Sequence, residues 1–179
     1  MQIPAEDLQY VTSLEEGVWG GILIAITLVI HGLGMIWTAR ASNALKHRYE
    51  HNQSFALGMG IVIVASWIII TVHLLEVMVW AAFFVWKNAM PTASLSYYFA
   101  LMDYTTLGSN YNLPLRWRLL EGMIGIAGLM TFAWSTGVLL SLAQAFQDQQ
   151  LQNMRRRREK PAHGSTPPAA PGPDHAEHS

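Results

Sequence analysis

The sequence predicts an all-α membrane protein with three transmembrane helices and a re-entrant short helix and loop between the second and the third. Of its 179 residues, 51% are hydrophobic and 13% are charged, which is too apolar for an ordinary soluble domain of this size. Three apolar stretches are each long enough to cross the hydrocarbon core of a bilayer, which takes about 20 helical residues. The chain has no cysteine, so disulfides and thiolate metal sites are excluded.

The three predicted crossings cover residues 18–39, 55–86 and 119–146. Trp19 and Trp37 stand near the two ends of the first crossing, about 27 Å apart along a helix that rises ~1.5 Å per residue. Tryptophan prefers the interface between hydrocarbon and water, so this pair is predicted to mark the membrane boundaries.

The Lys and Arg residues predict the orientation. Five of the eleven lie in residues 155–160, and three more lie between the first two crossings, namely Arg40, Lys46 and Arg48. Because the loops rich in these residues stay in the cytoplasm, the C-terminus is predicted to be cytoplasmic and the N-terminus, residues 1–16, extracytoplasmic. Arg155, Arg156, Arg157 and Arg158 are expected to contact anionic lipid headgroups.

Residues 92–104 form the segment that is too short to cross. They predict a helix of about three turns behind a possible N-cap, and a turn rich in Gly, Ser and Asn follows. Such a segment starts and ends on one face of the membrane. Lipid cannot satisfy nonhelical backbone at that depth, so the loop must be buried in protein or line water, which favours an oligomer around it.

The stretch "SYYFALMDYTTLG", followed by "LPLRWRLLEGMIGIAGLMTFAWSTGVL", resembles the small bacterial members of the potassium-channel superfamily, the two-transmembrane pore-domain ion channel family. In that family a short pore helix ends in Thr-Thr-Val/Leu-Gly-Tyr-Gly-Asp, and the next helix carries "WRLLE" and "WSTG" segments. The stretch "HLLEVMVWAAFFVW" is similar to the family's outer helix.

The resemblance covers about residues 55–147, more than half of the chain, and implies a division into parts. Residues 17–54 would add an extra first transmembrane helix and a cytoplasmic loop to a pore domain at 55–147. Residues 148–179 would form a basic, disordered cytoplasmic tail. The family implies a homotetrameric cation channel of the bacterial inner membrane.

The filter implied by the resemblance consists of Thr105, Thr106, Leu107, Gly108, Ser109 and Asn110. The family's Tyr-Gly-Asp is replaced here by Ser109, Asn110 and Tyr111. Gly108 keeps one position of positive φ, and Asn110 is expected to take the next, since asparagine tolerates the left-handed region. Ser109 removes a ring that would bury on the order of 150 to 250 Å².

A looser outer filter is therefore expected, with weak selectivity among monovalent cations. Near-normal potassium selectivity and a filter that does not conduct are the alternatives, and Tyr111 swinging into the vacated space would restore rigidity. Asp103 and Tyr111 are predicted to support the filter.

His31, His73 and Glu76 lie within the predicted crossings, where ionisable groups are costly and commonly functional. They are candidates for a proton or ion relay or for a metal site. An interhelical hydrogen-bond clamp is favoured over both, because a metal site needs three or four ligands and no dense set is visible in the sequence. No metal site is therefore predicted.

Gly125, Gly128 and Gly137 run along the third crossing. They are predicted to permit close helix packing, while a hinge in the inner helix is the alternative.

No enzyme activity is expected, since phosphate-binding loops, hydrolase elbows and nucleic-acid motifs are lacking in the sequence. The only small ligands expected are permeating K⁺ or Na⁺, and the expected partners are further copies of the chain and membrane lipids, not nucleic acid. A nonconducting membrane subunit that keeps the channel fold for assembly is the alternative function. A membrane enzyme or redox subunit using His31, His73 and Glu76 ranks last.

Overall fold

The computed structural model describes residues 13–48 and 55–159, and all of its regular structure is helical within those ranges. The long helices are α1 (Leu14–Arg48), α2 (Phe55–Trp86) and α4 (Leu119–Glu159). The short ones are α3 (Ala93–Tyr104) and the 3-10 turn η2 (Leu115–Trp117). The predictions for residues 1–12 and for the tail from 160 onward lie outside the described residues.

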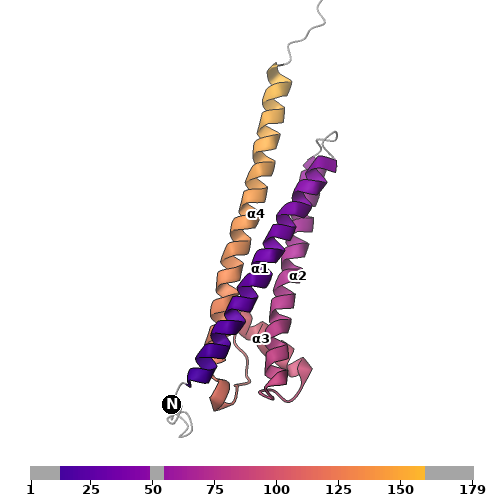
Figure 1. Ribbon diagram of the computed structural model, residues 1–179. Helices are drawn as coiled ribbons and strands as arrows, with labels where there is room; N and C mark the ends of the chain where they lie inside the picture. The colour runs from indigo at the N-terminus through magenta and orange to yellow at the C-terminus, as the bar shows by residue number, and fades with distance from the viewer. Residues whose placement is uncertain (1–12, 49–54, 160–179) are drawn as a thin grey trace, which may run out of the picture.

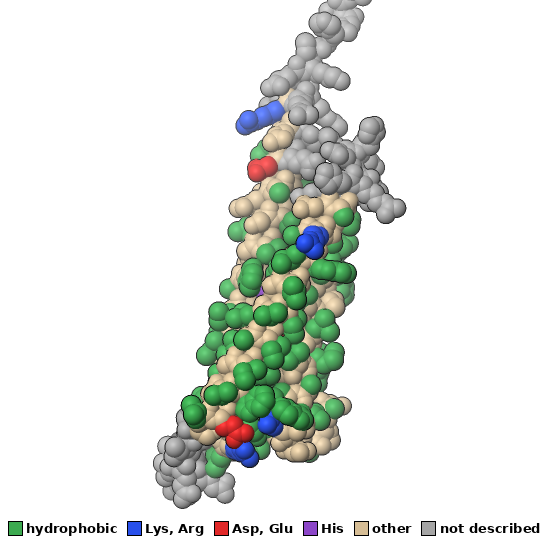
Figure 2. Space-filling view, in the orientation of Figure 1, with side chains coloured by type: hydrophobic (Ala, Val, Ile, Leu, Met, Phe, Trp, Pro, Cys, Tyr) green, Lys and Arg blue, Asp and Glu red, His purple; other side chains and the backbone are tan. Residues whose placement is uncertain are grey.

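Three helices are long and apolar enough to cross a membrane, as the sequence predicted. Their candidate spans are Leu14–Leu45, Gly58–Trp86 and Leu115–Gln152. The middle helix begins and ends where the sequence placed it, whereas the other two extend beyond the predicted crossings. Figure 2 shows an apolar band along the bundle, with the charged side chains toward its two ends.

The three long helices lie side by side, and α1 packs against both α2 and α4. The N-terminus of α1 is closed by a reciprocal pair of hydrogen bonds, because the Ser13 amide donates to the Glu16 carboxylate (3.1 Å) and the Glu16 amide donates to the Ser13 hydroxyl (3.2 Å). Glu16 also accepts a hydrogen bond from the Leu119 amide at 3.1 Å. The first turns of α1 and α4 are thereby fixed at the same end of the bundle.

The short helix α3 starts at that same end and points into the bundle (Figure 1). Thr92 caps it, since its extended backbone lets its hydroxyl accept the Leu95 amide at 3.2 Å. Its last residue, Tyr104, contacts Glu76, which lies ten residues before the end of α2. At ~1.5 Å per residue, α3 therefore reaches about 15 Å along the bundle from the end where it starts.

Aromatic packing holds both α3 and η2 against α2. Phe84 and Phe99 meet edge to face with centroids 5.5 Å apart, and Phe83 meets Trp117 in the same way at 5.6 Å. Tyr104 and Ile124 are buried in the same cluster.

Gly128 marks the closest approach of α3 to α4. A Cβ atom added there would collide with the backbone carbonyl of Tyr104. At Gly125 the nearest atom to such a Cβ would be the Asp103 carbonyl, at an ordinary 3.5 Å, and at Gly137 nothing lies within 4 Å. The packing hypothesis therefore holds for Gly128, whereas the spacing gives no packing reason for Gly137.

Gly128→Ala should destabilise the protein and Gly137→Ala should not. The added methyl group at 128 overpacks a contact with backbone, which typically costs about 1–3 kcal/mol. At 137 it enters open space and gains up to about 1 kcal/mol of helix propensity. Thermal unfolding of the two purified variants in one detergent measures the difference, and equal melting temperatures would contradict the contact at Gly128.

Candidate functional site

A buried polar network lies where the end of α3 meets the other helices. The Tyr104 hydroxyl donates to Glu76 Oε2 and lies 2.6 Å from Thr131 Oγ1. His73 Nδ1 is 3.0 Å from the same hydroxyl. Tyr104, Glu76 and Thr131 are at most 1% exposed, so their hydrogen bonds are made away from solvent.

His31 of α1 and His73 of α2 extend the network to Ser135 of α4. His31 Nδ1 lies 2.9 Å from Glu76 Oε1. The other ring nitrogens of His31 and His73, both Nε2, lie 3.3 and 3.0 Å from the single hydroxyl of Ser135. The network therefore joins α1, α2, the end of α3 and α4.

The structure brings together the three intramembrane residues that the sequence singled out. Hydrogen bonds between helices are the contacts that the clamp hypothesis requires, and they link Glu76 both to the first crossing and to α3. The ligand atoms of His31, His73 and Glu76 also all lie within 4.8 Å of one another. The expectation that no dense ligand set exists was therefore wrong, because the separation in sequence hid the packing of α1 on α2.

The loop after Tyr104 turns its amide groups back onto α3. The Thr106 amide donates to the Asp103 carbonyl (3.0 Å), and those of Leu107 and Gly108 donate to the Met102 carbonyl (2.9 and 3.2 Å). The Ser109 amide donates to the carboxylate of Asp103.

The carbonyl groups of the same residues face the opposite way. Every described peptide bond is trans, so each C=O points away from the N–H of the next residue. The carbonyls of Thr105, Thr106, Leu107 and Gly108 are therefore directed away from α3. None of the four accepts a hydrogen bond within the described part of the chain, and Leu107 is 74% exposed.

Positive φ angles at alternate positions produce this arrangement, with 60° at Thr106 and 75° at Gly108. The prediction for Gly108 is confirmed. The prediction for Asn110 is wrong, since Thr106 takes the second left-handed position. A β-branched residue is rarely found there, and the hydrogen bonds on both sides of Thr106 hold it in place.

The two threonine hydroxyls differ. That of Thr105 donates to the carbonyls of Leu101 and Met102, at 2.9 and 3.1 Å, so it is turned toward α3. Thr106 is exposed beside the free carbonyls. Of the two, Thr106 is the residue that can offer a hydroxyl on the carbonyl side.

Ser109 organises the altered half of the loop. Its hydroxyl donates to the Tyr111 carbonyl (2.8 Å) and accepts from the Tyr111 amide (3.3 Å), which makes a local turn. The ring of Tyr111 is 50% exposed. Beyond it, the Leu113 amide donates to Glu121 Oε1 at 2.6 Å, which fastens the loop to the first turn of α4.

Asp103 lies behind the loop, as predicted for a supporting residue. Burial and the nearby charge of Glu121 raise its pKa to about 6, and the hydrogen bond from the Ser109 amide opposes this rise. Its Oδ2 atom is buried without a hydrogen-bond partner in the described chain.

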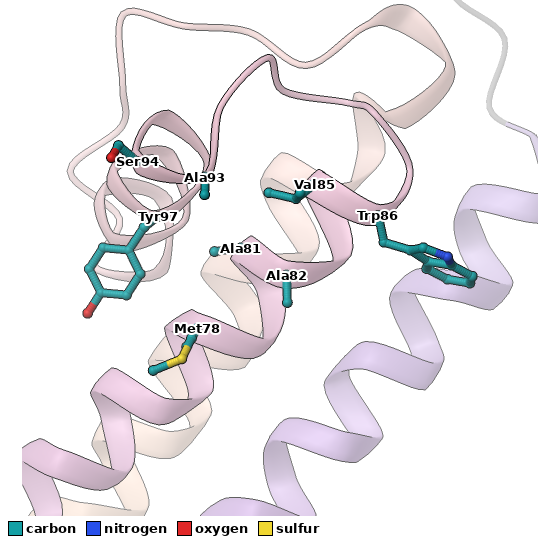
Figure 3. A pocket seen from close by; sticks show the side chains of 8 residues that line it. All are labelled: Met78, Ala81, Ala82, Val85, Trp86, Ala93, Ser94 and Tyr97. Carbon is teal, nitrogen blue, oxygen red and sulfur yellow. The ribbon is translucent and has the colours of Figure 1, made fainter.

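A groove lies on another side of α3, against the second half of α2 (Figure 3). Its lining is apolar apart from Ser94 and Tyr97, and it carries no ionisable group besides that phenol. The groove is separate from the polar network and provides no ligating set.

Tyr104 is an important residue of the polar network that was not assigned a role from the sequence. Ser96, Ala100 and Tyr104 recur every four residues and are all buried, so a helical stripe marked the inner face of α3.

No family model matches this chain, and no curated protein or solved structure is significantly similar to it.

Tyr104→Phe should lower stability more than Tyr98→Phe. The first change removes a buried hydroxyl shared by three side chains and should cost about 1–3 kcal/mol. Tyr98 lies on the same helix, is 46% exposed and provides the matched control. Chemical denaturation in detergent measures both, and indistinguishable midpoints would contradict the role of the network.

Asp103→Asn should remove a pH dependence of stability. Because the folded pKa is raised, the proton on Asp103 stabilises the fold fully below the pKa of a free aspartate, about 3.9. That contribution is lost as the pH rises through about 6. The wild-type melting temperature should fall over this window more than that of the variant. Asp148→Asn, at an exposed site on α4, should retain the wild-type profile.

Proposed function

We propose that this protein is a homotetrameric channel for monovalent cations in the bacterial inner membrane. The observation that carries the proposal is the row of four carbonyls, from Thr105 to Gly108, which faces away from the helix that anchors it and accepts no hydrogen bond from the described residues. Rings of such carbonyls from four subunits replace the hydration shell of a cation in selectivity filters.

The position of the loop supports a re-entrant segment. α3 enters from one end of the bundle, reaches about 15 Å along it, and the chain returns to the same end at η2. This depth is about half of a hydrocarbon core of ~30 Å. Free carbonyls there cannot face lipid, because an unsatisfied group costs several kcal/mol. A water-filled axis shared by four copies satisfies them.

Charged and aromatic residues support the orientation. Lys87 Nζ lies 4.5 Å from the Trp19 ring centroid and 4.3 Å from that of Trp86, which forms an interfacial cluster at the end where α3 starts. At the opposite end α1 stops beside the start of α2 and α4 projects beyond both, and the last residues of α1 and α4 are rich in Lys and Arg. That end is cytoplasmic in the proposal, the N-terminus is outside, and Arg155 to Arg158 meet anionic headgroups.

Weak selectivity follows from the altered half of the loop. Ser109 holds Tyr111 through one hydroxyl, and Tyr111 is half-exposed instead of packing behind the loop. The width of the outer filter is then set by a small local turn. We expect K⁺ and Na⁺ to pass with permeabilities that differ by less than about tenfold, because a filter of loosely fixed width discriminates less between cations.

One observation favours a second candidate. The Ser109 hydroxyl donates to the Tyr111 carbonyl, which ties the outer part of the loop into a local turn instead of an extended row of carbonyls. A tetramer of this kind that does not conduct would act as a membrane subunit for assembly with another protein.

Ion flux through the purified protein in liposomes separates the two functions. Wild type should pass both K⁺ and Na⁺. Gly108→Ala should abolish the flux, because its φ of 75° strains any residue with a Cβ. Gly21→Ala, where an added Cβ meets nothing within 4 Å, is the matched control and should conduct as wild type does.

The triple variant Ser109→Tyr, Asn110→Gly, Tyr111→Asp should become selective for K⁺. If the wild type passes no ions and the triple variant passes K⁺, the protein is a channel scaffold with a disabled filter. If neither passes ions although both form correctly folded tetramers, the channel proposal is contradicted.

A further inference from the structure

We propose that His31, His73 and Glu76 bind a divalent transition-metal cation of the Zn²⁺ type. Two imidazoles and one carboxylate form a donor set that Zn²⁺ commonly accepts, with water in a fourth position. This site is distinct from the carbonyls of the loop. Its occupancy does not depend on whether the loop conducts.

Each histidine nitrogen lies close to the Glu76 carboxylate, at a distance near that of neighbouring metal ligands. Zn–N and Zn–O bonds of about 2.0–2.1 Å place tetrahedral ligand atoms roughly 3.3 Å apart. His31 Nδ1 is 2.9 Å from Glu76 Oε1, and His73 Nδ1 is 3.4 Å from Glu76 Oε2. All three ligand atoms lie within 4.8 Å of one another, so a closer approach of His31 on α1 to the pair on α2 brings them around one ion. His73 and Glu76 lie three residues apart on one helix face, so only His31 comes from another element.

Outer hydrogen bonds orient the ligands as they do in metal sites. Metal-bound histidines generally donate their second ring N–H to a fixed acceptor, and bound carboxylates are themselves hydrogen-bonded. Both histidines present Nδ1 to Glu76 and direct Nε2 to the Ser135 hydroxyl, whose two lone pairs can accept both N–H groups. The Tyr104 hydroxyl holds Glu76 Oε2.

A count of hydrogens shows that the closed ring of hydrogen bonds through Tyr104, Ser135 and the three proposed ligands needs one more positive charge. Five hydrogen bonds connect Tyr104, Ser135 and the three proposed ligands. With Glu76 ionised and both imidazoles neutral, the tyrosine, the serine and the two histidines supply four hydrogens. Either one added proton or a cation completes the ring, and a lone buried carboxylate without it is costly. A metal ion between the Nδ1 atoms and Glu76 supplies this charge and leaves both Nε2–H groups for Ser135.

Equilibrium dialysis against ZnCl₂ with metal analysis tests the site on the full-length protein, purified without a histidine tag. We expect one tightly bound Zn²⁺ per chain and, after Co²⁺ substitution, the strong visible absorption of a four-coordinate ion. The tail variant His163→Ala, His175→Ala, His178→Ala should retain both, which separates the site from weak binding by the histidines near the C-terminus.

His31→Gln and Glu76→Gln should each remove the tight site and the Co²⁺ absorption, with folding checked by oligomeric mass and helix content. Ser135→Ala keeps all three ligands and should weaken binding by roughly 10- to 100-fold, which keeps the test decisive if a ligand variant does not fold. Binding that persists in folded ligand variants, or that disappears in the tail variant, would overturn the proposal. If the wild type does not bind Zn²⁺ tightly, the metal proposal is wrong, and the network is an interhelical hydrogen-bond clamp completed by one added proton.

Discussion

The hydrogen bond from the Tyr104 hydroxyl to Glu76 fixes the point from which the loop departs. Glu76 belongs to α2, its other oxygen is held by His31 of α1, and Thr131 of α4 contacts the same tyrosine. The last residue of α3 is therefore positioned by all three long helices at once. Burial makes each of these polar contacts obligatory, since an unpaired group at this depth would cost far more than the pair gains.

Beyond Tyr104, hydrogen bonds to α3 and trans peptide geometry constrain the backbone of the loop. The amides of Thr106 to Ser109 are bound to the end of α3, and the trans peptide geometry directs the preceding carbonyls outward. Gly128 lets α4 approach the Tyr104 carbonyl closely, so the anchor is also packed from behind. The half of the loop from Thr105 to Gly108 is thus held against α3, whereas the half from Ser109 to Tyr111 depends on the Ser109 hydroxyl and on Asp103. This asymmetry is the physical reason for proposing a cation path with weak discrimination.

The sequence predicted the helices well because hydrophobic length and capping are local properties. The middle crossing and the Thr92 cap are where they were expected, and α1 and α4 ran longer because polar residues can continue a helix once its hydrogen bonds are established. The meeting of His31 with Glu76 could not be predicted, since it depends on the register of α1 against α2 over 45 residues. Thr106 was missed as the left-handed residue because intrinsic preference favours Asn110, and the hydrogen bonds to α3 override that preference.

In the proposed channel the carbonyls of Thr105 to Gly108 face an axis shared by several copies of the chain. A cryo-electron microscopy structure of the protein in lipid nanodiscs with K⁺ present would show whether they do. We expect four chains around one axis, with those carbonyl oxygens directed at it and density for ions between their rings. Loops that lie at the perimeter of the assembly, or chains that share no such axis, would contradict the proposed channel.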